Sequence, residues 1–166
     1  MPTCPFEFDV SNFEIWGALL NGASLYLMDQ DKLLMPHVLK ETLLQQKISL
    51  MWMTTPLFNQ LASVDASLFR SLRYLIIGGD TLSPRQINKV RQACPALTLV
   101  NGYGPSENSV LSTTFAIERE YETRIPIGRP ISNSTAYILD RNQQFFCPWE
   151  RLVNYASGWK AWQEGT

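Results

Sequence analysis

The run Asn101-Gly-Tyr-Gly-Pro-Ser-Glu107 contains the residue types that a nucleotide-binding loop needs. Two glycines flank Tyr103, so the backbone on either side of its ring can approach a ligand closely. The ring offers a flat face for stacking on a nucleobase, and the Glu107 carboxylate offers the hard oxygen ligands that Mg²⁺ prefers. The same composition also suits an ordinary turn with a solvated glutamate, because Gly and Pro mark turns of many kinds.

The elements that must position this loop alternate between strand and helix. The apolar run Leu97-Thr-Leu-Val100 predicts a buried strand directly before the loop. We predict helices over residues 12–21, 36–46, 56–61 and 84–93, and strands over residues 24–28, 48–53, 73–77, 97–100, 110–117 and 135–139. This alternation predicts an α/β fold, a mostly parallel sheet with flanking helices.

Three polar or glycine-rich motifs fall where predicted parallel strands end. They are residues 52–55, residues 76–80 and the loop 101–107. Ligands of such sheets bind beyond the carboxyl ends of the strands, so we expect the three motifs to lie together.

Composition bounds the class of protein. A chain of 166 residues with 45% hydrophobic and 17% charged residues is one globular domain or a piece of a larger one. A net charge of −1 gives no electrostatic reason to expect nucleic acid or a membrane as a partner. The start of the chain lacks the regions of a signal peptide, and Cys4, Cys94 and Cys147 are odd in number and widely spaced. We therefore expect a cytoplasmic protein with free thiols.

The loop 101–107 resembles the N-x-Y-G-P-[ST]-E element of the adenylate-forming enzymes. In particular, it resembles the adenylation (AMP-binding) domains of non-ribosomal peptide synthetases, which activate amino acids. Four further motifs follow the order of that family, namely Phe8-Asp-Val-Ser11, Thr55-Pro56, Ile77-Gly-Gly-Asp80 and Ile127-Gly-Arg-Pro130. Any one of these motifs is weak, but five in order are specific. The resemblance covers about residues 6–144 and implies part of the large N-terminal subdomain of such an enzyme.

The resemblance implies a reaction and a set of nucleotide-binding residues. The family joins an amino acid to ATP with Mg²⁺, and the acyl group then passes to a phosphopantetheine on a carrier domain, with condensation domains nearby. Glu107 would be the catalytic residue and the metal ligand, and Tyr103 would stack on adenine. The residues implied to lie on the nucleotide are Gly79, Asp80, Asn101, Gly102, Tyr103 and Gly104. For Asp80, a turn aspartate ahead of a helix is an equal alternative.

Asp9 is the second informative residue, because a carboxylate at an apolar helix start is costly unless it is paired. In the resemblance it binds the ammonium group of an α-amino acid; from the residues alone, a helix N-cap is the favoured alternative. The pocket implied by the family consists of Asp9, Val10, Phe13, Trp52, Ile76, Gly78, Gly102, Val110 and Leu111. Apart from Asp9 these residues are apolar or glycine, so we predict valine or a similar branched aliphatic substrate.

The family pattern stops after Gln144. Residues 145–166 carry Trp149, Trp159 and Trp162 of the five tryptophans, without a clear period. Reverse translation in the frame that starts at the third base of each codon permits a string close to the family's glycine-rich G-E-L hairpin. We therefore divide the chain into a partial AMP-binding domain, residues 1–144, and an out-of-frame tail, residues 145–166, which we expect to be poorly ordered or to pack without a regular hairpin. A genuine, divergent C-terminus is the alternative.

Several parts of the family's machinery have no counterpart in these residues, among them the phosphate loop and the C-terminal lysine. We therefore expect a central fragment that does not catalyse ATP–pyrophosphate exchange alone. A non-catalytic remnant or pseudogene product is one alternative. A fragment of an acyl-CoA ligase is another, and Asp9 argues against it.

Overall fold

A mixed five-stranded sheet forms the centre of the protein in the computed structural model, which describes residues 1–139, 142 and 144–148. The strands β1 (Leu50–Thr54), β2 (Tyr74–Gly78) and β3 (Thr98–Tyr103) are parallel neighbours. The strands β4 (Thr113–Ala116) and β5 (Arg129–Pro130) extend the sheet beyond β3 in antiparallel pairings. The predicted α/β class is confirmed, and the parallel half of the sheet is the part that carries the sequence motifs.

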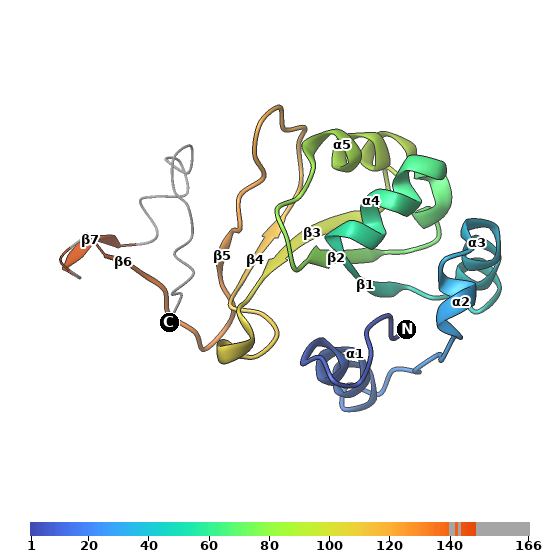
Figure 1. The fold of residues 1–166 in the computed structure, drawn as a ribbon, viewed down its shortest axis with the longest axis horizontal. Coiled ribbons are helices and arrows are strands. Elements are labelled where there is room, and N and C mark those ends of the chain that lie inside the picture. Colours follow the sequence, from blue (N-terminus) through green and yellow to red (C-terminus); the bar gives the residue numbers. More distant parts are fainter. Residues whose placement is uncertain (140–141, 143, 149–166) are drawn as a thin grey trace.

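Helices lie on both faces of the sheet (Figure 1). The helices α4 (Thr55–Val64) and α5 (Pro84–Ala93) cover one face, and α1 (Val10–Leu19) lies beyond the other. The helices α2 (Gln30–Leu33) and α3 (Pro36–Gln45) lie at the edge formed by β1. Two short 3₁₀ helices complete the description, η1 (Ala66–Phe69) after α4 and η2 (Ser106–Asn108) after β3. No helix of the described residues has both the length and the apolar composition that a membrane span requires.

The two faces of the parallel strands carry different side chains, because successive side chains of a strand point to opposite faces of the sheet. On the face toward α4 and α5 lie the core residues of the strands, which are at most 1% exposed: Met51, Met53, Leu75, Ile77 and Leu99. On the opposite face, the strand register aligns Trp52 with Ile76 and aligns Gly78 with Gly102. The candidate substrate residues therefore occupy the face that the main core does not use.

Two predicted elements need correction. Residues 24–28 form no strand, although Tyr26 and Met28 pack against the core. A strand needs a neighbour for its hydrogen bonds, and no described strand pairs with this segment. The prediction for residues 110–117 was too long, because β4 begins only at Thr113 and the three preceding residues belong to a loop.

The strands β6 (Tyr137–Leu139) and β7 (Phe145–Pro148) form a separate antiparallel pair with a register irregularity between Ile138 and Leu139. The first four residues of the predicted tail, where we expected no regular hairpin, therefore form a strand in an irregular antiparallel pair. The residues of β7 find backbone hydrogen-bond partners on β6, which is what a strand requires. The remainder of that prediction, residues 149–166, lies outside the described residues.

A charged contact ties α3 to η1 and gives a pH-dependent prediction. Lys40 Nζ lies 2.7 Å from Asp65 Oδ2, and Asp65 Oδ1 accepts hydrogen bonds from the Ser67 amide and hydroxyl. The Lys40 ammonium and the Ser67 donors lower the pKa of Asp65 from 3.8 to about 2. A depressed carboxyl pKa adds stability that is complete above about pH 4 and disappears as the pH falls toward 2.

We expect Asp65→Asn to flatten the acid limb of the stability curve. Because the pair is partly solvated, the loss at pH 7 should be about 1 kcal/mol or less. Urea unfolding at pH 7, 5, 4 and 3 measures both effects. A variant that loses stability between pH 5 and pH 3 as steeply as the natural chain would contradict the assignment.

Candidate functional site

The carboxyl ends of β1, β2 and β3 are aligned, as the sequence motifs predicted. The register pairs Thr54 with Gly78 and Gly78 with Gly102. Thr55 Oγ1 lies 3.1 Å from the carbonyl oxygens of both Gly78 and Asp80, so this buried hydroxyl holds the end of β1 to the turn after β2. Thr55 was known only as part of a family motif, and the structure gives it this joining role.

A tryptophan ring packs across two glycines on the free face of the sheet. A Cβ at Gly78 would lie 2.5 Å from Trp52 Cη2 and 2.3 Å from the Gly102 carbonyl oxygen. A Cβ at Gly102 would lie 2.8 Å from Leu111 Cδ2, 3.0 Å from Ile76 Cγ2 and 3.1 Å from Trp52 Cζ3. Both positions therefore have to be glycine for the ring to lie this close to the backbone. We call Trp52, Ile76, Gly78, Gly102 and Leu111 the glycine floor.

The structure thus gathers five of the nine predicted pocket residues into one contact group. Val110 lies beside this group, since its carbonyl oxygen packs against Gly104. The other three, Asp9, Val10 and Phe13, are half-buried residues at the start of α1. Thr3 connects the two groups, because its hydroxyl lies 3.2 Å from Glu14 Oε1 on α1 and 3.1 Å from the Trp52 carbonyl oxygen on β1.

Asp9 occupies the N-cap position of α1 without making a side-chain capping hydrogen bond. The nearby hydroxyl of Ser11 instead donates to the carbonyl oxygens of Phe6 and Phe8, at 3.2 and 2.8 Å. The helix start is therefore organised by Ser11, and the Asp9 carboxylate is not engaged as a cap. The N-cap alternative is therefore right about the position of Asp9, but the side-chain capping bond that it predicted is absent.

Glu14 is a buried carboxylate that sequence reasoning missed. It is 7% exposed and accepts hydrogen bonds from the Thr3 amide at 2.8 Å and the Cys4 amide at 3.3 Å. Burial raises the pKa of Glu14, and the hydrogen bonds from Thr3 and Cys4 oppose that rise. Ser11 and Glu14 are the buried residues of α1, so polar contacts dock this helix.

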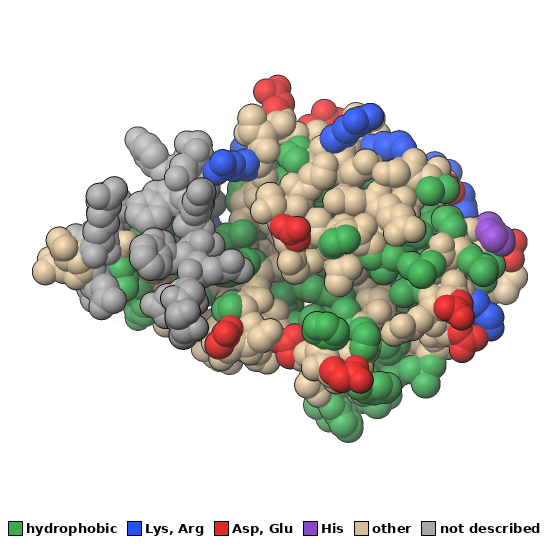
Figure 2. Space-filling model, viewed as in Figure 1, with side chains coloured by type: hydrophobic (Ala, Val, Ile, Leu, Met, Phe, Trp, Pro, Cys, Tyr) green, Lys and Arg blue, Asp and Glu red, His purple; other side chains and the backbone are tan. Residues whose placement is uncertain are grey.

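The outer side of α1 is strongly apolar. Trp16, Leu19 and Leu20 are 52%, 49% and 78% exposed. Figure 2 shows hydrophobic side chains gathered along the lower edge of the molecule, where Figure 1 places α1. Sequence periodicity alone did not predict this, because apolar residues at helical spacing ordinarily indicate the face that packs on a core.

The predicted nucleotide residues lie at the end of β3 and in the turn after β2. Tyr103 and Gly104 are half-buried, Glu107 is exposed on η2, and Gly79 has a positive φ of 85°. Asn101 is 5% exposed, and its amide donates to the Pro126 carbonyl oxygen at 2.8 Å. This bond holds the segment before β5 against β3, a structural task that the motif itself did not indicate.

Asp80 forms a local turn contact, in which its Oδ1 accepts a hydrogen bond from the Thr81 amide nitrogen at 2.6 Å. This is the turn geometry that was the alternative to a nucleotide contact. Among the described residues no group of three or more His, Cys, Asp or Glu side chains is placed to hold a metal. Glu107 supplies one exposed carboxylate, whose oxygens are of the hard kind that Mg²⁺ prefers.

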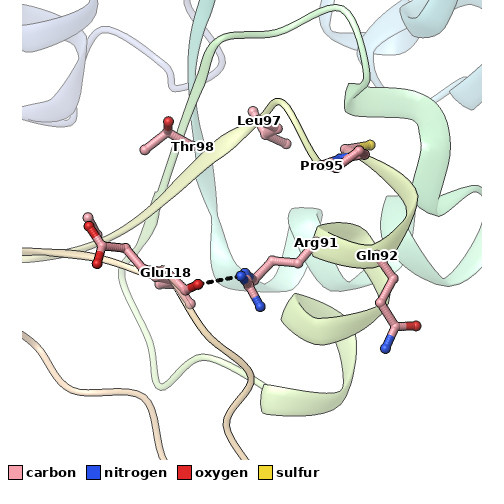
Figure 3. Close-up of a pocket in the computed structure, with 9 residues that line it drawn as sticks. Arg91, Gln92, Pro95, Leu97, Thr98 and Glu118 are labelled. Carbon is pink, nitrogen blue, oxygen red and sulfur yellow. Dashed lines mark hydrogen bonds between the residues drawn. The ribbon is translucent and has the colours of Figure 1, made fainter.

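A cavity of about 410 Å³ lies at the opposite end of the sheet from these residues (Figure 3). Its walls come from the end of α5, the start of β3 and the segment after β4. Arg91 reaches across it and donates to the Glu118 carbonyl oxygen, as the dashed line in Figure 3 marks. None of the predicted site residues lines this cavity, so we place the candidate site at the strand ends instead.

Comparison with known proteins agrees with the motifs. The family model for "AMP-binding enzyme" matches residues 1–151. Surfactin synthase subunit 2 of Bacillus subtilis (strain 168) is 56% identical over 137 residues, which cover 82% of this chain and 4% of that protein. Tyrocidine synthase 3 of Brevibacillus parabrevis is 54% identical over 137 residues, covering 82% of this chain and 2% of that protein. The chain therefore spans only a small part of the length of these relatives.

A solved structure extends the similarity to three dimensions. The holo form of PA1221, described as a non-ribosomal peptide synthetase protein containing adenylation and PCP domains, superposes with a TM-score of 0.78 at 34% identity. The match covers 87% of this chain and 25% of that one. The motifs, the strand ends and these matches lead to one assignment: the chain belongs to the AMP-binding enzyme family, among the adenylation domains of non-ribosomal peptide synthetases.

Proposed function

We propose that this chain carries the amino-acid pocket and part of the nucleotide site of an enzyme that forms aminoacyl-adenylates from ATP. The observation that carries the proposal is the glycine floor, which lies at the carboxyl ends of three parallel strands beside the loop of Tyr103 and Glu107. In parallel α/β sheets this is where ligands bind.

In the proposed reaction, a carboxylate oxygen of the amino acid attacks the α-phosphorus of ATP. The bond to the bridging oxygen of pyrophosphate breaks, and the products are aminoacyl-adenylate and pyrophosphate. Such a reaction depends chiefly on positioning and on offsetting developing negative charge. Tyr103 would hold the adenine ring by stacking, with Gly79, Asp80, Asn101, Gly102 and Gly104 around the nucleotide.

Glu107 would contribute a carboxylate oxygen to the Mg²⁺ ion, which offsets the charge of the phosphates. Its exposure supports this role, because such an ion keeps several waters and phosphate oxygens as ligands. On the other side of the floor, the carboxylate of Asp9 would pair with the ammonium group of the amino acid. The acyl group would then pass to the phosphopantetheine of a carrier domain, with condensation domains as further partners.

Valine is the substrate that we propose, with isoleucine or leucine next. The floor and its neighbours Val10, Phe13 and Val110 offer no charge and no hydroxyl to a substrate side chain. A polar side chain would lose its water without gaining a partner there, which disfavours it. The Trp52 ring above Gly78 and Gly102 shortens the space, which disfavours large aromatic side chains.

A chimera tests the proposal. The 137 matched residues of this chain would replace their counterparts in the surfactin synthase relative, and ATP–pyrophosphate exchange would be measured with each of the twenty amino acids. We expect exchange that is highest with valine, and about 10-fold or more lower when Glu107→Ala is introduced. A preference for an acidic, basic or amide side chain would show that the pocket is assigned to the wrong residues.

A further inference from the structure

The segment that follows β3 closes on itself. The Ser112 amide donates to the Tyr103 carbonyl oxygen at 2.8 Å, so the chain that leaves the sheet at Tyr103 returns beside it. A Cβ at Gly104 would lie 2.5 Å from the Val110 carbonyl oxygen and 2.8 Å from Leu111 Cα. The outgoing and returning backbones therefore touch directly. We call residues 103–112 the return loop.

Ser109 lies at the far side of the return loop in a backbone conformation that is almost confined to glycine. Its φ is 64° and its ψ is −156°. A residue with a side chain adopts this conformation only when its surroundings force it to. The two amides before the bend are already used, since Asn108 N donates to Pro105 O and Ser109 N donates to Ser106 O.

One side-chain hydrogen bond spans the strained residue. Asn108 Nδ2 lies 2.7 Å from Ser112 Oγ, so the residue directly before Ser109 is joined to one three positions after it. Both ends of this bond border residues of the candidate site. Asn108 follows Glu107, and Ser112 follows Leu111, whose Cδ2 belongs to the glycine floor.

We propose that the Asn108–Ser112 hydrogen bond is a clasp that holds Ser109 in its strained conformation. It thereby positions Leu111 on the glycine floor and Glu107 at the mouth of the site. Asn108 and Ser112 are thus positioning residues. The roles of Glu107 and Leu111 rest on the proposed function, whereas the clasp itself depends only on the geometry of the return loop.

Amide hydrogen exchange in the full 166-residue chain tests the clasp. The amides of Asn108, Ser109 and Ser112 should exchange about 2- to 10-fold faster in Asn108→Ala and in Ser112→Ala, which is the range that one lost hydrogen bond gives. Ser112→Thr keeps the hydroxyl and should exchange at the natural rate. Amides of β2 serve as the control and should be unchanged in all variants.

A ¹⁹F NMR measurement tests whether loss of the clasp changes the surroundings of Trp52 in the glycine floor. With 5-fluorotryptophan incorporated, the ¹⁹F resonance of Trp52 is assigned by its loss in Trp52→Phe. That resonance should shift or broaden in Asn108→Ala and Ser112→Ala, because Leu111 no longer keeps its place beside Gly102, which the Trp52 ring also adjoins. It should keep its natural position in Ser112→Thr.

Rescue by glycine separates the clasp from a general loss of packing. In the double variant Ser109→Gly with Ser112→Ala, glycine adopts the positive φ without strain. The amide exchange rates should therefore return to within about twofold of the natural rates, and the Trp52 resonance should return to its natural position. The proposal would be overturned if glycine did not restore these values, or if amide hydrogen exchange were unchanged in both Asn108→Ala and Ser112→Ala. Since no nucleotide is present in these measurements, a chimera without exchange activity would refute the proposed function and leave the clasp intact.

Discussion

Gly78→Ala is expected to destabilise the chain by about 3 kcal/mol and to break up the glycine floor. The added Cβ would lie 2.3 Å from the Gly102 carbonyl oxygen and 2.5 Å from Trp52 Cη2. The carbonyl belongs to the neighbouring strand, so it cannot move without disturbing the β2–β3 pairing. Relief must come from the Trp52 ring and the strand together. Urea unfolding followed by circular dichroism measures the loss, and fluorescence of the buried indole reports the ring.

Gly17→Ala is the matched control for this prediction. Position 17 lies inside α1, and a Cβ there would meet only Phe13 ring atoms, the nearer at 3.9 Å. Alanine favours a helix interior over glycine, so this variant should gain about 0.5–1 kcal/mol. If Gly78→Ala unfolds at the same urea concentration as the natural chain, the close approach of Trp52 to the backbone is wrong.

The sequence predicted the elements of the parallel half because each has a strong local signal. Ser83 and Pro84 mark the start of α5, and the apolar runs at 73–77 and 97–100 differ from β2 and β3 by only a few residues. Residues 24–28 have the same kind of apolar composition but form no strand. Composition records the tendency to be extended, whereas a strand also requires a neighbour, which local sequence does not encode.

In the candidate site, too, local sequence signals predicted the residues, whereas contacts that depend on the fold were not predicted. The motifs predicted Gly78 and Gly102 as site residues, but their contact with Trp52 depends on the register between three strands. Glu14 was not predicted, because its partners are the backbone amides of Thr3 and Cys4 and the Thr3 hydroxyl, and only the fold brings them to it. The strain at Ser109 was equally hidden, since serine is not a residue that predicts a positive φ.

The last prediction separates the two ends of the proposed amino-acid pocket in the chimera. Asp9→Ala should lower kcat/KM for every amino acid by about 10- to 100-fold, because it removes a charged contact to the ammonium group that all of them share. The absence of a capping bond at Asp9 means that helix α1 should survive the change, and circular dichroism checks this. Asp9→Asn provides the matched variant, with nearly the same shape and without the charge.

Trp52→Ala acts at the other end and should change the order of substrates. The indole packs against Gly78 and Gly102, so its removal would enlarge the proposed pocket beside these glycines. One methylene in an apolar pocket is worth about 1–3 kcal/mol, so the ratio of leucine or phenylalanine to valine should rise by about 10-fold or more. Because Trp52 is 3% exposed, Trp52→Phe is the milder companion that preserves more packing. Equal losses for all amino acids in both tryptophan variants would mean that Trp52 only supports the fold. An altered order of substrates in Asp9→Ala would show that Asp9 does not bind the ammonium group that all amino acids share.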